Sequence, residues 1–91
     1  MTTKAWTPGP WTVEKSRIKS LDKRATIAEV SIGYLPSLEY RANRYLIAAA
    51  PDMAEALLKC LLVLSGEVSS KNAVIEALEY ASSALKKARG E

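Results

Sequence analysis

The sequence contains no histidine, a single cysteine and no glycine-rich motif of the kind that binds phosphate. Histidine is the usual general acid or base near neutral pH and the commonest metal ligand, so its absence excludes the most frequent catalytic and metal-binding sites. Cys60 cannot form a disulfide within the chain, and one cysteine makes neither a zinc site nor an activated nucleophile without further ligands or a base. We therefore predict that the protein is not an enzyme and holds no cofactor or metal.

The sequence also lacks a hydrophobic run long enough to cross a membrane. The stretch richest in apolar residues, 45 to 64, is interrupted by Pro51, Asp52, Glu55 and Lys59, whereas a spanning helix needs about 20 apolar residues. The N-terminal residues contain no apolar segment of the length that a signal peptide requires. We expect no membrane partner, and the single cysteine fits a reducing, intracellular setting.

The length of 91 residues is enough for one domain, since compact domains usually contain about 100–150 residues. We expect a single domain over residues 1–91, with a β-hairpin region over 1–36 and a helical region over 37–90. A chain of this size buries only roughly 60–65% of its unfolded surface, so left-over apolar surface favours association. A homo-oligomer, dimeric or larger, is therefore expected.

Before residue 36 the sequence carries short β-like runs, WTVEK, RIKSL and ATIAEVSI. In the last of these, three apolar residues alternate as in a strand with one buried face: Ala28, Val30 and Ile32. Ile27 breaks the alternation, which indicates either a bulge or a contact with a neighbouring chain. Gly33 and Pro36 end the run. An antiparallel sheet of two or three strands is predicted.

After Pro36 apolar residues recur at spacings of three and four, which predicts helices. Ser37 is the expected N-cap of the first helix. Pro51 removes an amide donor and ends that helix, and proline is also favoured as the first residue of a helix. The second helix is therefore predicted from residue 51 to about 64. Because it is apolar nearly all round, its second side is expected to pack against another subunit.

A third helix is predicted from a cap at Ser69 or Ser70 to about residue 88. The short connection before it predicts that the second and third helices form an antiparallel hairpin. The expected fold class is thus α+β, a small N-terminal antiparallel sheet followed by two or three helices.

Positive charge is concentrated between residues 15 and 24. The net charge of the chain is +3, and this segment contains five bases against Asp22 alone. The five are a candidate anion-binding group: Lys15, Arg17, Lys19, Lys23 and Arg24. Such a group favours an anionic partner; the alternative is a solvated hairpin whose charges keep an exposed strand edge from pairing. No aromatic residue interleaves them, so nucleic-acid binding is an alternative that is not favoured.

Two motifs then occur in order: TPGPW at Thr7 to Trp11, and RANRYLIAAAPDMAEAL at Arg41 to Leu57, with IAEV between them. The chain resembles a large family of short bacteriophage and prophage proteins, in which T-P-G-P-W leads a small sheet and A-N-A-R-L-I-A-A-A-P-D leads the helices. Tyr45 stands where that pattern commonly has arginine. The resemblance implies a phage accessory protein that acts in the cytoplasm of the infected or lysogenic bacterial host.

In outline the expected fold is also similar to phage sponges that disarm Thoeris immunity by trapping cyclic ADP-ribose signals. This likeness implies an oligomer that sequesters a nucleotide-type signal, such as a cyclic nucleotide. The residue types that such a ligand needs gather around the first helix: Arg41, Asn43, Arg44, Tyr34 and Tyr40. Arginine forks onto phosphate, asparagine reads an adenine edge and tyrosine stacks on a base. The alternatives are that these residues only cover a helix surface, or that the protein inhibits a host protein by binding it.

Overall fold

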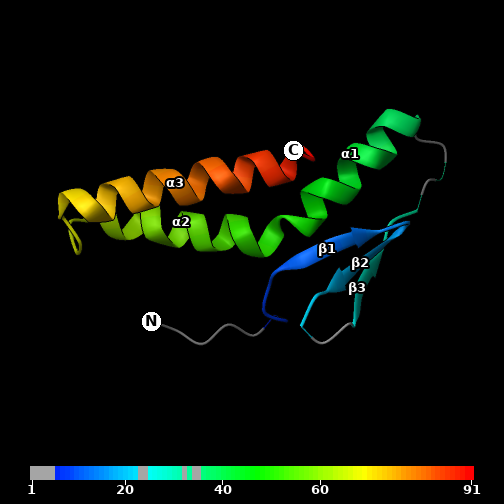
Figure 1. Cartoon of the computed structure of the whole chain (residues 1–91), viewed down its shortest axis with the longest axis horizontal. Helices are drawn as coiled ribbons and strands as arrows, with labels where there is room; N and C mark the ends of the chain where they lie inside the picture. The colour runs from blue at the N-terminus through cyan, green and yellow to red at the C-terminus, as the bar shows by residue number, and fades with distance from the viewer. Residues whose placement is uncertain (1–5, 23–24, 32, 34–35) are drawn as a thin grey trace.

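The computed structural model describes residues 6–22, 25–31, 33 and 36–91. It shows a three-stranded sheet followed by three helices, which confirms the predicted α+β class (Figure 1). The molecule measures 46 × 26 × 17 Å. The sheet and the first helix form one end, and a pair of long helices extends from it to form the other (Figure 1).

The sheet has antiparallel strands in the order of the chain. Its strands are β1 (Trp11–Glu14), β2 (Arg17–Ser20) and β3 (Thr26–Glu29). Ile18 pairs with Ala28 but Lys19 pairs with Thr26, so Ile27 is the extra residue of an irregularity in the register. Of the two explanations for the broken alternation at Ile27, the shift in register agrees with the bulge.

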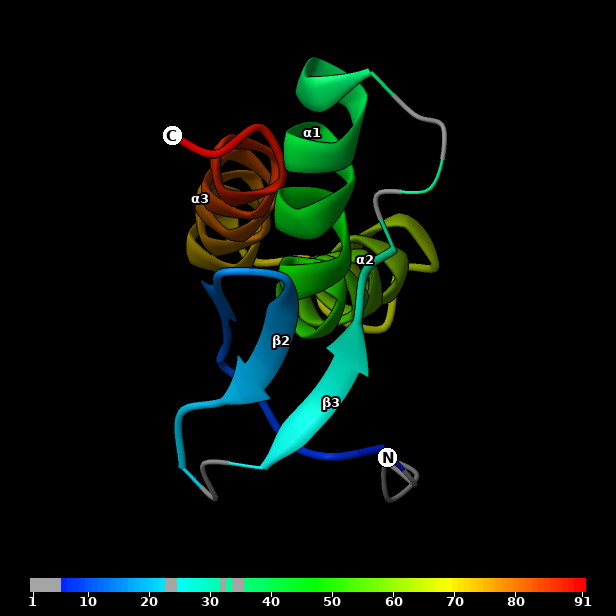
Figure 2. The same cartoon turned by 90° about the vertical axis from the view of Figure 1, so that its right-hand side faces the viewer.

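Helix α1 (Ser37–Ala48) packs on the sheet through β1 and β2 (Figure 2). Ile18 of β2 is completely buried, and Ala48, the last residue of α1, is 2% exposed. The predicted cap at Ser37 is wrong by one residue. Pro36 occupies the cap position in an extended conformation, without a side-chain cap, and its carbonyl accepts a hydrogen bond from the Tyr40 amide at 3.0 Å. The fixed φ of proline already turns the chain into the helix, so Ser37 becomes its first residue.

The break between the first two helices lies where the proline predicts it. Helix α2 (Ala50–Leu64) begins one residue before Pro51. Ala49 joins the two helices: its amide donates to Tyr45 of α1 at 3.0 Å, and its carbonyl accepts from Met53 of α2 at 2.8 Å. Ala49 is fully buried, so a larger side chain would not fit this corner.

The N-terminal segment packs against the same corner. A Cβ atom on Gly9 would lie 2.9 Å from the Cβ of Pro51, closer than real Cβ contacts. Trp11 fixes the segment from its other side, because its indole Nε1 donates to the carbonyl of Thr7 at 3.1 Å. The two sequence motifs, TPGPW and IAAAPD, are therefore neighbours in space, and Gly9 provides the close approach.

Helix α3 (Lys71–Ala88) lies beside α2 and forms the predicted hairpin with it (Figure 1). Ser70 is the cap, since its Oγ accepts a hydrogen bond from the Ala73 amide at 3.1 Å. The buried residues of the two helices are all alanines: Ala56, Ala77 and Ala84. Within the described residues, neither these helices nor α1 combine the length and apolar character that crossing a membrane requires.

Gly90 and Gly66 offer a matched test of how the C-terminus docks. Both have positive φ, +81° and +84°, but a Cβ on Gly90 would lie 2.9 Å from the Tyr45 ring whereas one on Gly66 meets nothing within 4 Å. Gly90→Ala should therefore destabilise the protein by about 1 kcal/mol more than Gly66→Ala, since only the first adds overpacking to the shared backbone strain. Urea unfolding measures both, and equal losses would show that the C-terminus does not pack on Tyr45.

Candidate functional site

Arg44 joins α1 to the turn between β1 and β2. Its Nη1 donates a hydrogen bond to the backbone carbonyl of Lys15, and its guanidinium carbon lies 4.9 Å from the centre of the Tyr40 ring. Lys15 has a φ of +55°, a left-handed conformation that is unusual for a residue with a side chain. The arginine therefore holds a strained turn against the helix through its Nη1, while its buried Nε has no hydrogen-bond partner among the described residues.

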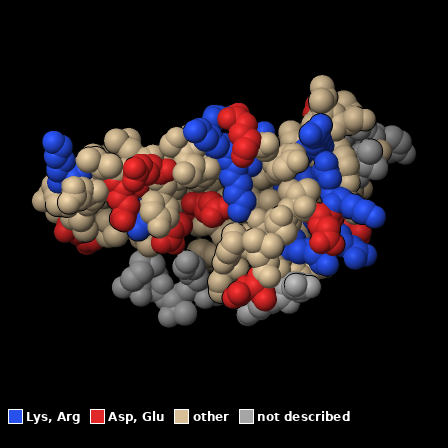
Figure 3. Space-filling view, in the orientation of Figure 1, with Lys and Arg blue, Asp and Glu red and all other residues tan. Residues whose placement is uncertain are grey.

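This contact brings the two predicted groups of site residues to one end of the molecule. We call that end the basic end and define it by five cations: Lys15, Arg17, Lys19, Arg41 and Arg44. Figure 3 shows lysine and arginine side chains over the sheet and α1, with carboxylates among them. The other predicted site residues divide in two. Tyr40 and Asn43 lie on α1, while Lys23, Arg24 and Tyr34 lie outside the described residues.

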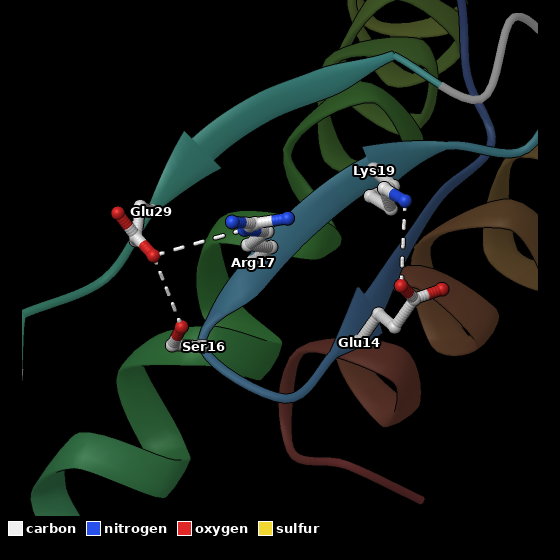
Figure 4. A network of polar contacts seen from close by, with 5 residues as sticks. All are labelled: Glu14, Ser16, Arg17, Lys19 and Glu29. Carbon is white, nitrogen blue, oxygen red and sulfur yellow. Dashed lines mark hydrogen bonds and ion pairs between the residues drawn. The ribbon is translucent and has the colours of Figure 1, made fainter.

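Two cations of the basic end pair with carboxylates of the sheet (Figure 4). Lys19 Nζ lies 3.3 Å from Glu14 Oε1, and Arg17 Nε lies 3.7 Å from Glu29 Oε2. Ser16 Oγ donates to the same oxygen of Glu29 at 3.4 Å. The Arg17 pair is more than half exposed on both sides, and such pairs contribute only about 0–1 kcal/mol. An incoming anion could therefore replace Glu29 at little energetic cost.

The other cations of the basic end, apart from Arg44, are not paired with the described carboxylates of the sheet. Lys15 and Arg41 are exposed, and neither forms an ion pair within the part of the chain that the structure describes. Asn43 is half-buried on α1. An open hollow of about 360 Å³ lies at the β1–β2 turn, and its lining comes from this turn and the strands around it: Glu14, Lys15, Ser16, Arg17 and Glu29. Arg41 and Asn43 are near neighbours of Arg44 on the helix but do not line this hollow.

The lining of the hollow combines hydrogen-bond donors and acceptors. Arg17 and Lys15 supply cationic donors suited to a phosphate, while Glu14 and Glu29 accept hydrogen bonds from hydroxyl or amino groups. Among residues 6–22, 25–31, 33 and 36–91, no group of three acidic, histidine or cysteine side chains is placed to hold a metal ion. These groups are complementary in chemistry to a small molecule that carries both anionic and hydrogen-donating groups.

Sequence reasoning did not find three of these residues: Glu14, Ser16 and Glu29. The sheet register was the missing signal, since it pairs Glu14 with Arg17 and Arg17 with Glu29. Counting charge only between residues 15 and 24 left both carboxylates out. Lys87, in the last turn of α3, also joins this helix to α2, since its Nζ lies 2.6 Å from Asp52 Oδ2.

A family model described as Salmonella phage P22 protein Y8K6 matches residues 1–91, so the chain belongs to that family. No curated protein and no solved structure matches the chain. The family confirms the phage assignment that the sequence motifs implied. The likeness to the cyclic ADP-ribose sponges stays a prediction.

The structural role of Arg44 can be separated from that of Arg41 on the same helix. Arg44→Ala removes the hydrogen bond to Lys15 and the contact with Tyr40, so it should lower the free energy of unfolding by about 1–3 kcal/mol. Arg41 is exposed, and Arg41→Ala should change stability by less than about 0.5 kcal/mol. Urea unfolding of both variants tests this difference. Similar losses for the two variants would mean that Arg44 does not hold the turn.

Proposed function

We propose that this member of the phage P22 protein Y8K6 family is a non-enzymatic accessory protein that binds and sequesters a nucleotide-type signalling molecule. It would thereby counter host defence in the cytoplasm of the infected or lysogenic cell. The main observation in support is the hydrogen bond from Arg44 to the Lys15 carbonyl. It brings the polar hollow at the β1–β2 turn close to the arginines of α1. The likeness in outline to nucleotide sponges agrees with this proposal as an analogy of fold.

The chemistry of the hollow supports a nucleotide over a simple anion. Arg17 exchanges its exposed partner Glu29 for a phosphate, which it can bind through two parallel hydrogen bonds. Lys15 adds a second positive charge from the same turn. Glu14 and Glu29 then accept hydrogen bonds from ribose hydroxyl or base amino groups. A ligand with both kinds of group satisfies all four side chains at once.

The size and charge of the hollow also support a small ligand over a nucleic acid. Its volume of about 360 Å³ lies near the lower end of the roughly 300–1,000 Å³ typical of small-molecule sites. A nucleic acid is bound chiefly by neutralising a row of phosphates. Two glutamates in the lining and a third acid, Glu39, in the first turn of α1 repel such a row.

A thermal-shift titration of the full chain with a panel of cyclic mononucleotides, cyclic dinucleotides and cyclic ADP-ribose tests the proposal. A ligand present at about 100 times its Kd stabilises the folded state by about 2.7 kcal/mol. For a domain of this size that raises Tm by roughly 11–22 °C. Arg17→Ala should abolish the shift, because it removes the phosphate-binding guanidinium. The matched control Lys71→Ala removes an exposed cation at the far tip of the hairpin and should leave the shift unchanged.

A panel in which no nucleotide raises Tm contradicts the proposal, as does a shift that Arg17→Ala leaves intact. The same protein should be titrated with a short DNA duplex at two salt concentrations. Duplex affinity that falls steeply with salt, without any nucleotide shift, would instead assign the basic end to nucleic acid.

A further inference from the structure

The α2–α3 hairpin has two unlike faces, of which one is polar. On it, Lys59 Nζ lies 3.3 Å from Glu76 Oε1 and 4.5 Å from the centre of the Tyr80 ring. The pair between Asp52 and Lys87 joins the helices nearer their base. We call this the polar face. The four charged groups named here are paired across the two helices, and acidic and basic side chains lie over both helices in Figure 3.

The other face exposes large apolar side chains. The helical repeat places residues three, four and seven apart on one stripe, and such stripes on α2 and α3 lie on either side of a groove of about 210 Å³. Six residues line the groove, and none carries a charge: Cys60, Val63, Leu64, Val74, Ala77 and Leu78. We call this the apolar face and define it by residues that are 39–85% exposed: Leu57, Leu61, Leu64, Val74, Ile75, Leu78 and Leu85.

The apolar face is as large as one side of a stable interface. At these exposures the seven residues together present on the order of 700 Å² to water, against about 800 Å² that each partner contributes to a standard interface. The largest apolar patch of a typical monomer is about 300–600 Å². Meanwhile, among the described residues, the buried apolar core consists of Ile18 and five alanines. Apart from Ile18, the large apolar side chains of the described residues are thus outside it.

We infer that the apolar face is covered by the same face of a second copy, so that two hairpins form a four-helix bundle. Two helices side by side present parallel ridges and a groove, and an identical hairpin fits them by packing ridges into grooves. The groove carries no charge that would match a charged partner. In a two-fold dimer with antiparallel hairpins, the exposed Glu67 at the tip of one copy lies near the basic last turn of the other, which contains Lys86. This inference does not depend on the proposed nucleotide.

Light scattering with size-exclusion chromatography on the full chain measures the oligomeric state. At a concentration on the order of 100 µM, which populates even a dimer with a Kd of about 10 µM, the mass should be twice the 9.9 kDa of the chain. The double variant Leu61→Glu, Leu78→Glu should elute as a single chain, because it would bury two unpaired charges in the dimer. These positions are 61% and 65% exposed, so far-UV circular dichroism should show unchanged helix content.

The matched control is Asn72→Glu with Ser83→Glu. Both residues are exposed and lie on the polar side of α3, so this variant adds the same charge and should remain a dimer. A second readout uses Cys60, which lines the groove and is the sole thiol. Its alkylation should be several-fold slower in the wild type at high concentration than after dilution below the dimer Kd.

Three results would overturn the inference. They are a wild type that is a single chain at high concentration, a Leu61→Glu, Leu78→Glu variant that stays dimeric, and Cys60 alkylation that is independent of concentration. If the chain forms a stoichiometric complex with a host protein through the apolar face, and no dimer, the face would be assigned to that protein instead.

Discussion

The bond between Arg44 and the carbonyl of Lys15 is the contact on which the candidate site depends. It fixes a turn of unusual backbone conformation against α1, and so fixes where the side chains of Arg17 and Lys15 project. The hollow at this turn would change shape if the turn were released. Arg44 thus contributes by positioning, while the exposed cations beside it are the ones free to meet a ligand. Arg44 of α1 has a structural role, and through it the polar side chains at the β1–β2 turn have a defined arrangement.

Buried alanines determine how closely the three helices pack. Ala48 and Ala49 allow the sharp change of direction between α1 and α2, and Gly9 allows the N-terminal segment to lie on the same corner. Alanines at the contact between α2 and α3 bring those helices close together. Small residues in the interior leave little apolar area to bury within one chain. The seven large residues of the apolar face lie outside this interior, and the inferred dimer removes them from water.

Much of the fold could be predicted from local rules. The pattern of β-branched residues located the strands, the break in alternation located the bulge at Ile27, and Pro51 located the start of α2. Each of these signals is a property of one residue and its immediate neighbours. The cap of α1 was misplaced because the local rule favours serine at a cap, whereas the backbone angles put Pro36 there, without a side-chain cap.

The candidate site was less predictable, because its geometry depends on contacts between distant residues. Arg44 binds a backbone carbonyl, and every residue offers one, so no sequence pattern points to Lys15. The pairing of Arg17 with Glu29 requires the strand register, which a charge count along the sequence ignores. Residue types that suit a nucleotide could be picked out from the sequence, but the sheet residues that line the hollow, Glu14 and Ser16 among them, could not.

The most direct test of the proposed function is to identify what the protein carries. The full chain should be purified from bacterial cells whose nucleotide-based defence has been triggered, then denatured, and the released small molecules analysed by mass spectrometry. We predict a phosphate-containing nucleotide in stoichiometric amounts from the wild type and a greatly reduced amount from Arg17→Ala prepared in parallel. Release of no nucleotide from the wild type, or equal release from both proteins, would contradict the assignment of the basic end as a nucleotide site.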